Sequence, residues 1–175
     1  GQTMDRAVRQ ADRDGVSEPP VDQDAREAYV EEIRLIERAH RRFLDVVKDE
    51  LERLGHDDIN NIQAILLFNI GEEELAPCEL KARGYYLGSN VSYNLKKLME
   101  LGFIEQRRST DDRRTVKVRL TAKGRGIVEG IEALIERHLA SLAPIGGVTA
   151  DDLAGVNRLL KRLERYWTDQ VLYRL

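Results

Sequence analysis

Residues 89–124 constrain the fold more than any other part of this sequence. They read as a helix over residues 89–101, closed by a glycine, and then as two short strands, residues 103–108 and 115–120. At about 100° per residue the helix has one apolar side, and alternate residues of the second strand are apolar. We therefore predict an amphipathic helix followed by a β-hairpin with one buried face. The apolar side of the helix carries Val91, Leu95 and Leu98.

The opposite side of this helix is rich in amides, hydroxyls and cations. A helix that enters the DNA major groove needs such a face. Asn can bond adenine edges, Lys can reach guanine or phosphate, and Ser and Tyr can hold phosphates. An ordinary amphipathic surface helix is the alternative, and the arginine-rich hairpin that follows favours DNA. The candidate DNA contacts on the helix are Ser89, Asn90, Ser92, Tyr93, Lys96 and Lys97.

Charge is distributed unevenly along the chain, whose net charge is −3. Residues 76–126 hold 12 Lys and Arg against 5 Asp and Glu, a balance of +7, and the rest of the chain carries −10. A basic block inside an acidic chain is the electrostatic footprint expected for a polyanion partner. On the hairpin, the candidate phosphate contacts are Arg107, Arg108 and Lys117.

Helices are predicted on both sides of this block, so the fold class is mainly α with a small β-hairpin. Before it we expect a long helix over residues 24–54, a helix over residues 59–70 capped by Asp58, and a short helix over residues 78–83. After it we expect helices over residues 122–142 and from about residue 150 to 171. Helix, turn, helix and hairpin is the order of a winged helix-turn-helix module.

Three regions follow from this pattern. Residues 1–22 are charged, carry Gly and Pro, and are interpreted as a flexible arm, with a helix that reaches a partner subunit as the alternative. Residues 55–121 form the predicted DNA-binding domain. Residues 23–54 and 122–175 form a helical region whose apolar surface indicates a homodimer interface. Packing within one chain is the alternative explanation of that surface.

Composition excludes several other classes of protein. No apolar run reaches the roughly 18 residues of a membrane span, no signal peptide is visible, and the single cysteine fits a reducing compartment. We therefore expect a cytoplasmic protein without a membrane partner. No Gly-rich phosphate loop or Ser/His/Asp constellation appears, so we expect no enzyme.

No cofactor and no metal are expected either. The three histidines, His40, His56 and His138, show no ligand spacing with one another or with Cys78. Cys78 itself is interpreted as a half-buried structural residue. A reactive thiolate at a helix N-terminus is the alternative.

Two tracts resemble a known family. The tract from Asp112 to Gly124, Asp-Arg-Arg-Thr-Val-Lys-Val-Arg-Leu-Thr-Ala-Lys-Gly, is similar to the wing signature of MarR-family regulators, Asp-x-Arg followed by a strand that ends Leu-Thr-x-x-Gly. The tract from Arg83 to Leu98 looks closest to an alphaproteobacterial branch that includes LdtR- and PetP-type regulators. The resemblance covers roughly residues 25–173.

This resemblance implies a homodimer with the first and last helices at its base and a winged module on each subunit. Arg114 would enter the minor groove from the wing tip, with Asp112 holding it in place, and Arg113 would be an additional cation. The two recognition helices would read a pseudo-palindromic operator.

Members of the family are often released from DNA by small, frequently aromatic molecules. Here the walls of such an effector site would come from His40, Phe43, Ile65 and Phe68. The leading hypothesis is thus a ligand-responsive regulator, most often a repressor in this family. A non-specific architectural or protein-interaction module is the alternative.

Overall fold

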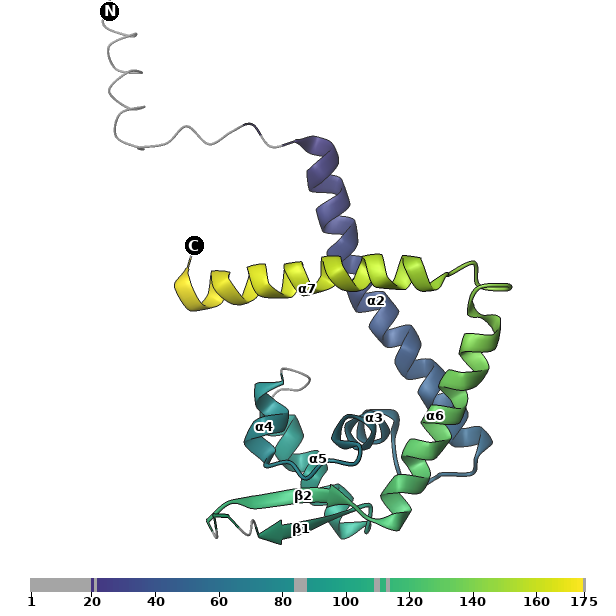
Figure 1. Cartoon of the computed structure of the whole chain (residues 1–175), viewed down its shortest axis with the longest axis vertical. Helices are drawn as coiled ribbons and strands as arrows, with labels where there is room; N and C mark the ends of the chain where they lie inside the picture. Colours follow the sequence, from purple (N-terminus) through teal and green to yellow (C-terminus); the bar gives the residue numbers. More distant parts are fainter. Residues whose placement is uncertain (1–19, 21, 84–87, 109–110, 113, 175) are drawn as a thin grey trace, which may run out of the picture. The chain divides into compact units, whose positions relative to one another are not determined.

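The computed structural model describes residues 20, 22–83, 88–108, 111–112 and 114–174, and of Ser89 only the backbone. The predicted fold class is confirmed, because the chain is mostly helical with one two-stranded antiparallel hairpin (Figure 1). The elements are α2 (Gln23–Arg53), α3 (Asn61–Ile70), α4 (Pro77–Ala82), α5 (Gly88–Glu100), β1 (Ile104–Arg108), β2 (Val116–Leu120), α6 (Ala122–Leu142) and α7 (Ala150–Tyr173).

The chain divides into two compact units, Gly1–Leu44 and Asp45–Leu175. In the described part of the first unit the long helix leaves apolar side chains exposed, among them Tyr29, Ile33, Ile36 and Phe43. The predicted N-terminal arm lies outside the described residues, except for Pro20 and Asp22. The predicted division into arm, helical region and DNA-binding domain stays a prediction.

The second unit contains the hydrophobic core. Its largest fully buried side chains come from the last part of α2, from α3, α4, α5 and β2, and from the residue that precedes β1, and α6 closes the core through Ile127 and Ile131. For α5, the 3.6-residue spacing of apolar residues predicted the buried side, which carries Val91, Leu95 and Leu98. The fully buried set includes Leu66, Leu67, Ile70, Leu80, Leu98 and Phe103.

The start of α3 differs from the prediction. Asn60 caps this helix: its Oδ1 accepts from the backbone N–H of Gln63 at 2.8 Å, and Gln63 Oε1 accepts from the Asn60 N–H at 3.1 Å. Asp58, the predicted cap, instead receives Lys123 Nζ at 2.9 Å, and this ion pair lowers the pKa of Asp58. The helix therefore begins at Asn61, two residues later than predicted.

The hairpin pairs in the register Ile104 with Leu120 and Arg108 with Val116. A short third segment joins it, because Leu75 exchanges two backbone hydrogen bonds with Val118, of 3.0 and 2.7 Å. The segment between α3 and α4 is thus tied by its backbone to the middle of β2. This bridge decides where the acidic side chains just before it lie.

The junction between β2 and α6 is held by Thr121, Lys123 and Gly124. Thr121 caps α6, with its Oγ1 accepting from the Gly124 N–H at 3.2 Å and donating to the Gly102 carbonyl at 2.6 Å. A Cβ on Gly124 would lie 2.1 Å from the Phe103 carbonyl oxygen. Lys123 Nζ donates to the Leu101 carbonyl at 2.9 Å and lies 4.3 Å from the centre of the Phe103 ring. The Leu-Thr-x-x-Gly pattern therefore builds the joint between wing and helix.

A buried carboxylate fastens the end of α2 to α6 within the second unit. Glu50 is buried and pairs with Arg53 on its own helix and with Arg137 Nη2 at 2.8 Å. The hydrogen bond from Arg53 is the largest cause that lowers the pKa of Glu50 to about 2, with the bond from Arg137 adding to it against the cost of burial. The carboxylate is therefore ionised at neutral pH.

Candidate nucleic-acid interface

The predicted recognition helix, α5, presents its polar face to solvent. Its apolar side is closed into the core, with Val91, Leu95 and Leu98 at most 3% exposed, whereas Tyr93 is 66% exposed. The helix begins at Gly88, one residue before the predicted start, so the backbone of Ser89 lies inside it. The remaining helix candidates are all exposed, and they are Asn90, Ser92, Lys96 and Lys97.

A hydrogen bond between two buried side-chain amides, which the sequence did not predict, supports the covered side of α5. Asn94 is 8% exposed and its Oδ1 accepts from Gln63 Nε2 at 3.4 Å. The other end of the Gln63 amide is committed to the capping box of α3. Because the Gln63 amide is held in place, its hydrogen bond to Asn94 favours one rotation of the recognition helix about its axis. Apolar contacts alone do not specify that rotation. Asn94 therefore belongs to the support of the interface, not to its surface.

The hairpin carries the second set of candidates. Arg107, Arg108 and Arg114 are exposed and Lys117 is half-exposed, so all four cations are open to a ligand at the surface. Arg113 lies outside the described residues. Register places Arg107 opposite Lys117, so these two cations share the outer face of the hairpin.

Asp112 organises the turn that carries Arg114. One carboxylate oxygen accepts from the backbone N–H of Arg114 at 3.0 Å and the other from Thr115 Oγ1 at 3.0 Å. The backbone bond, followed by the Thr115 hydroxyl, lowers the pKa of Asp112. Asp112 thus fixes the backbone at Arg114 and leaves the Arg114 side chain exposed. The insertion of Arg114 into the minor groove stays a prediction.

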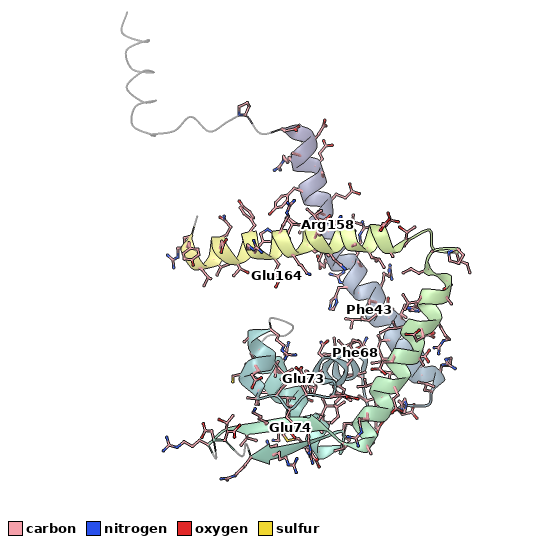
Figure 2. All side chains as sticks on the ribbon, viewed as in Figure 1. Phe43, Phe68, Glu73, Glu74, Arg158 and Glu164 are labelled. Carbon is pink, nitrogen blue, oxygen red and sulfur yellow. The ribbon has the colours of Figure 1, made fainter. Side chains whose placement is uncertain are left out.

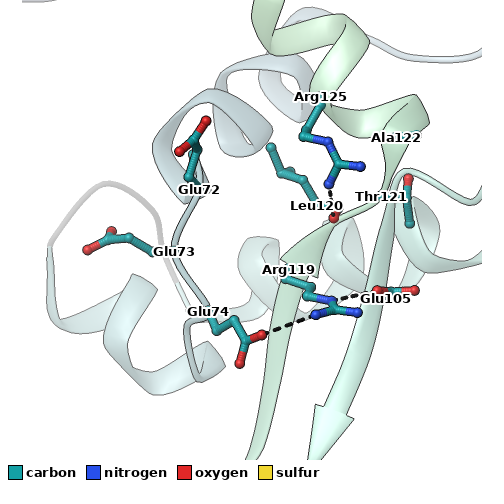
Figure 3. Close-up of a pocket in the computed structure, with 10 residues that line it drawn as sticks. Glu72, Glu73, Glu74, Glu105, Arg119, Leu120, Thr121, Ala122 and Arg125 are labelled. Carbon is teal, nitrogen blue, oxygen red and sulfur yellow. Dashed lines mark hydrogen bonds and ion pairs between the residues drawn. The ribbon is translucent and has the colours of Figure 1, made fainter.

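Carboxylates lie beside these cations. Glu73 and Glu74 lie between α3 and α4 (Figure 2). Glu74 Oε1 lies 3.4 Å from Arg107 Nη1 and 3.3 Å from Arg119 Nη1. Arg119 also donates from Nε to Glu105 Oε1 at 2.5 Å (Figure 3). Glu105, followed by Glu74, raises the pKa of Arg119. The positive charge on the outer face of the hairpin is therefore partly neutralised within the protein.

Arg119 and its two carboxylate partners border a hollow of about 470 Å³ at the base of the wing. Glu72, Glu73, Glu74 and Glu105 supply carboxylates, and Arg125 closes one side by donating from Nη1 to the Leu120 carbonyl at 3.3 Å (Figure 3). Glu74 is not among the residues that the sequence predicts for the interface.

The predicted effector residues belong to different units. His40 and Phe43 lie in the first unit and are exposed. Ile65 and Phe68 lie in the second unit and pack, half-buried, against the hydrophobic core. An effector site built from these residues stays a prediction.

The one cysteine is placed differently from the prediction. Cys78 is exposed on the first turn of α4 rather than half-buried. Within the described ranges, no group of three or more His, Cys, Asp or Glu side chains is arranged to hold a metal ion. The same part of the chain contains no helix with the length and apolarity to cross a membrane.

A model of the winged helix DNA-binding domain matches residues 59–124. These residues run from just before α3 to the start of α6, and so include the helix-turn-helix, the hairpin and the Gly124 joint. The match covers every candidate DNA contact named above.

One curated relative extends almost the whole length of the chain. The exopolysaccharide II synthesis transcriptional activator ExpG of Rhizobium meliloti is 36% identical over 169 residues, which cover 95% of this chain and 87% of ExpG. The similarity therefore includes α2 and α7 as well as the winged module.

Solved structures of similar fold include two complexes with DNA. A MarR mutant from E. coli bound to operator DNA superposes with a TM-score of 0.59 at 26% identity, covering 74% of this chain and 91% of that one. FabT of Streptococcus pneumoniae in complex with DNA gives a TM-score of 0.63 at 22% identity, covering 81% and 98%.

Proposed function

The chain belongs to the MarR family of winged helix-turn-helix transcriptional regulators, and we propose that it acts as a homodimer on a pseudo-palindromic operator under the control of a small effector. As a member of that family it is a DNA-binding transcriptional regulator and not an enzyme. The proposal concerns the operator that the protein binds, its oligomeric state and the effector that releases it from DNA.

The observation that carries the proposal is the two-sided construction of α5. Its inner side is fixed by buried Val91, Leu95 and Leu98, while the amide, phenol and ammonium groups of Asn90, Tyr93 and Lys97 stand free of the core. Base edges in the major groove are read by such groups held on a rigid helix. Phosphate contacts from the wing cations would add affinity that falls with salt.

Exposed apolar surface supports the dimer. No residue of α7 is buried, although it carries Leu153, Val156, Leu159 and Tyr166. Solvent-exposed apolar surface of this extent on a folded chain is typical of a contact with another chain. A second copy of the same chain is the occupant we propose, because a two-fold dimer would pair two recognition helices with two operator half-sites.

The effector proposed is a small molecule, with an aromatic compound as the first class to screen. Binding would release DNA only if the effector prefers one of two dimer geometries over the other. His40, Phe43, Ile65 and Phe68 are the side chains to substitute once a ligand is found. The proposed site of action is the cytoplasm.

Repression is the sign of regulation we propose first, following the family. The name of ExpG specifies an activator, and its similarity over 95% of this chain makes activation the second candidate. Transcription from the protein's own promoter, measured with and without the protein, distinguishes the two.

Fluorescence anisotropy on DNA from the protein's own promoter, against scrambled DNA of equal length, tests operator choice. We expect promoter DNA to bind about three orders of magnitude more tightly at physiological salt. Equal affinity for both would favour an architectural module over a specific regulator. Light scattering on the same samples measures the oligomeric state.

The Arg114→Ala variant tests the assignment of the wing. Its side chain is exposed on a turn held by Asp112, so we expect a loss of sequence-specific affinity of about 1–3 kcal/mol with little change in stability. Arg38→Ala, which removes an exposed arginine from α2, is the matched control and should leave the affinity unchanged. Unchanged operator affinity in Arg114→Ala would remove the wing from the interface.

A further inference from the structure

We infer that Glu74 competes with DNA for the wing and so limits how tightly this protein binds DNA of any sequence. The inference rests on the proposed function, since it assumes that the outer face of the hairpin meets the phosphate backbone. It assigns to Glu74 a role opposite to that of the cations beside it.

The position of Glu74 is fixed by the backbone that follows it. Leu75 is bound to Val118 by hydrogen bonds of 3.0 and 2.7 Å, which make it a one-residue third strand beside β2. Side chains alternate along a strand, so Glu74 falls on the other side of this sheet from buried Leu75. That side also carries Arg107, Lys117 and Arg119.

The contacts of Glu74 draw on the same donors that DNA would use. A single carboxylate oxygen, Oε1, lies 3.4 Å from Arg107 Nη1 and 3.3 Å from Arg119 Nη1. Arg119 is additionally held by Glu105 (Figure 3). Among the described contacts, Arg107 has Glu74 as its only ion-pair partner within 4.0 Å. Arg107 is therefore the cation that removal of Glu74 would release.

A carboxylate and a phosphate oxygen are both anionic acceptors, and an arginine donor that serves one is less available to the other. The Glu74 and Arg107 side chains are 42% and 58% exposed, so their ion pair is weak and DNA phosphate can displace it. Before DNA arrives, the pair of arginines is balanced by the pair Glu74 and Glu105. Displacement costs the same for every DNA sequence, because phosphates carry no sequence information.

Glu74→Gln is the test, with Glu72→Gln as its matched control. Glu72 lies two residues earlier, borders the same hollow, and points away from Arg119 (Figure 3). Both variants remove one negative charge from the same segment. Any long-range effect of net charge should therefore appear in both, whereas the loss of a contact with Arg107 occurs only in Glu74→Gln.

We expect Glu74→Gln to bind promoter and scrambled DNA each about threefold to fivefold more tightly than the wild type. The slope of log affinity against log salt should steepen by roughly 0.9, as for one additional phosphate contact. Glu72→Gln should change both quantities much less. In an Arg107→Gln background, the gain from Glu74→Gln should disappear.

Equal effects of the two glutamate substitutions, or weaker DNA binding by Glu74→Gln, would overturn the inference. Weaker binding would make Glu74 a residue that positions Arg107 for phosphate. Thermal unfolding of each variant excludes loss of fold as the cause. If the wild type binds neither DNA, the proposed function fails and this inference with it, whereas the other two results leave the proposed function intact.

Discussion

Helices α5 and α7 are both amphipathic, but α5 buries its apolar side whereas α7 leaves its apolar side exposed. In α5 the apolar side is closed against the core, with Leu98 fully buried, and the polar side is the candidate surface for DNA. In α7 no residue is buried, and Leu159 and Tyr166 are 49% and 55% exposed. An apolar stripe that the chain itself covers is part of the fold. A stripe that it leaves exposed indicates a partner, so the same sequence pattern serves two purposes.

The largest expected effect comes from removing an apolar side chain from the covered stripe. Leu98→Ala should lower the free energy of unfolding by about 2–5 kcal/mol, because it leaves a cavity in a closed core. Leu159→Ala, the same change on α7, should lower it by far less when measured at low protein concentration. Urea denaturation of both variants makes the measurement, and equal losses would abolish the distinction between the two helices.

A polar substitution on the exposed stripe should act on assembly instead. Tyr166→Ser should weaken the dimer by about 1–3 kcal/mol, because aromatic side chains often dominate such interfaces. Lys161→Ser, on the polar side of α7, is the control. Sedimentation equilibrium measures the dissociation constant. If the wild-type protein is monomeric, the exposed apolar stripe of α7 must have a partner other than a second copy of this chain.

The smallest expected effect concerns Asn94, which lies on the covered side of α5. Asn94→Leu keeps the size of the side chain but removes the acceptor for Gln63. We expect stability to change little and the preference for promoter over scrambled DNA to fall about tenfold, which is roughly 1.4 kcal/mol. Asn157→Leu, an exposed asparagine of α7, should leave the preference unaltered. A retained preference in Asn94→Leu would make the amide pair purely structural.

The sequence predicted the elements well where one period decides the outcome. Val91, Leu95 and Leu98 recur at helical spacing, and burial followed from the period alone. The residues that it missed depend on partners far along the chain. Asn94 is buried because Gln63, 31 residues away, reaches it, and Asp58 serves Lys123 instead of capping α3. Nothing local distinguishes such a side chain from a solvated one.

Charge shows the same limit. Alternation along the second strand predicts that Arg119 lies on the side opposite buried Val118, and the register places Arg107 on the same side as Arg119. Glu74 neutralises part of the positive charge of these arginines, and its place beside them depends on the bridge between Leu75 and Val118. Two backbone hydrogen bonds form this bridge, and no periodicity in the sequence predicts it. Composition predicted a basic surface, but the net charge of that surface required the fold.

The joint at Gly124 has a consequence for how sequences of this kind can diverge. Any β-carbon there would lie 2.1 Å from the Phe103 carbonyl oxygen, inside the contact distance of any carbon and oxygen. Among the standard amino acids, only glycine fits without moving the end of the hairpin. Substitutions during evolution can therefore change which bases α5 reads, whereas Gly124 has to be retained. The position is thus a landmark by which distant sequences can be aligned to this chain.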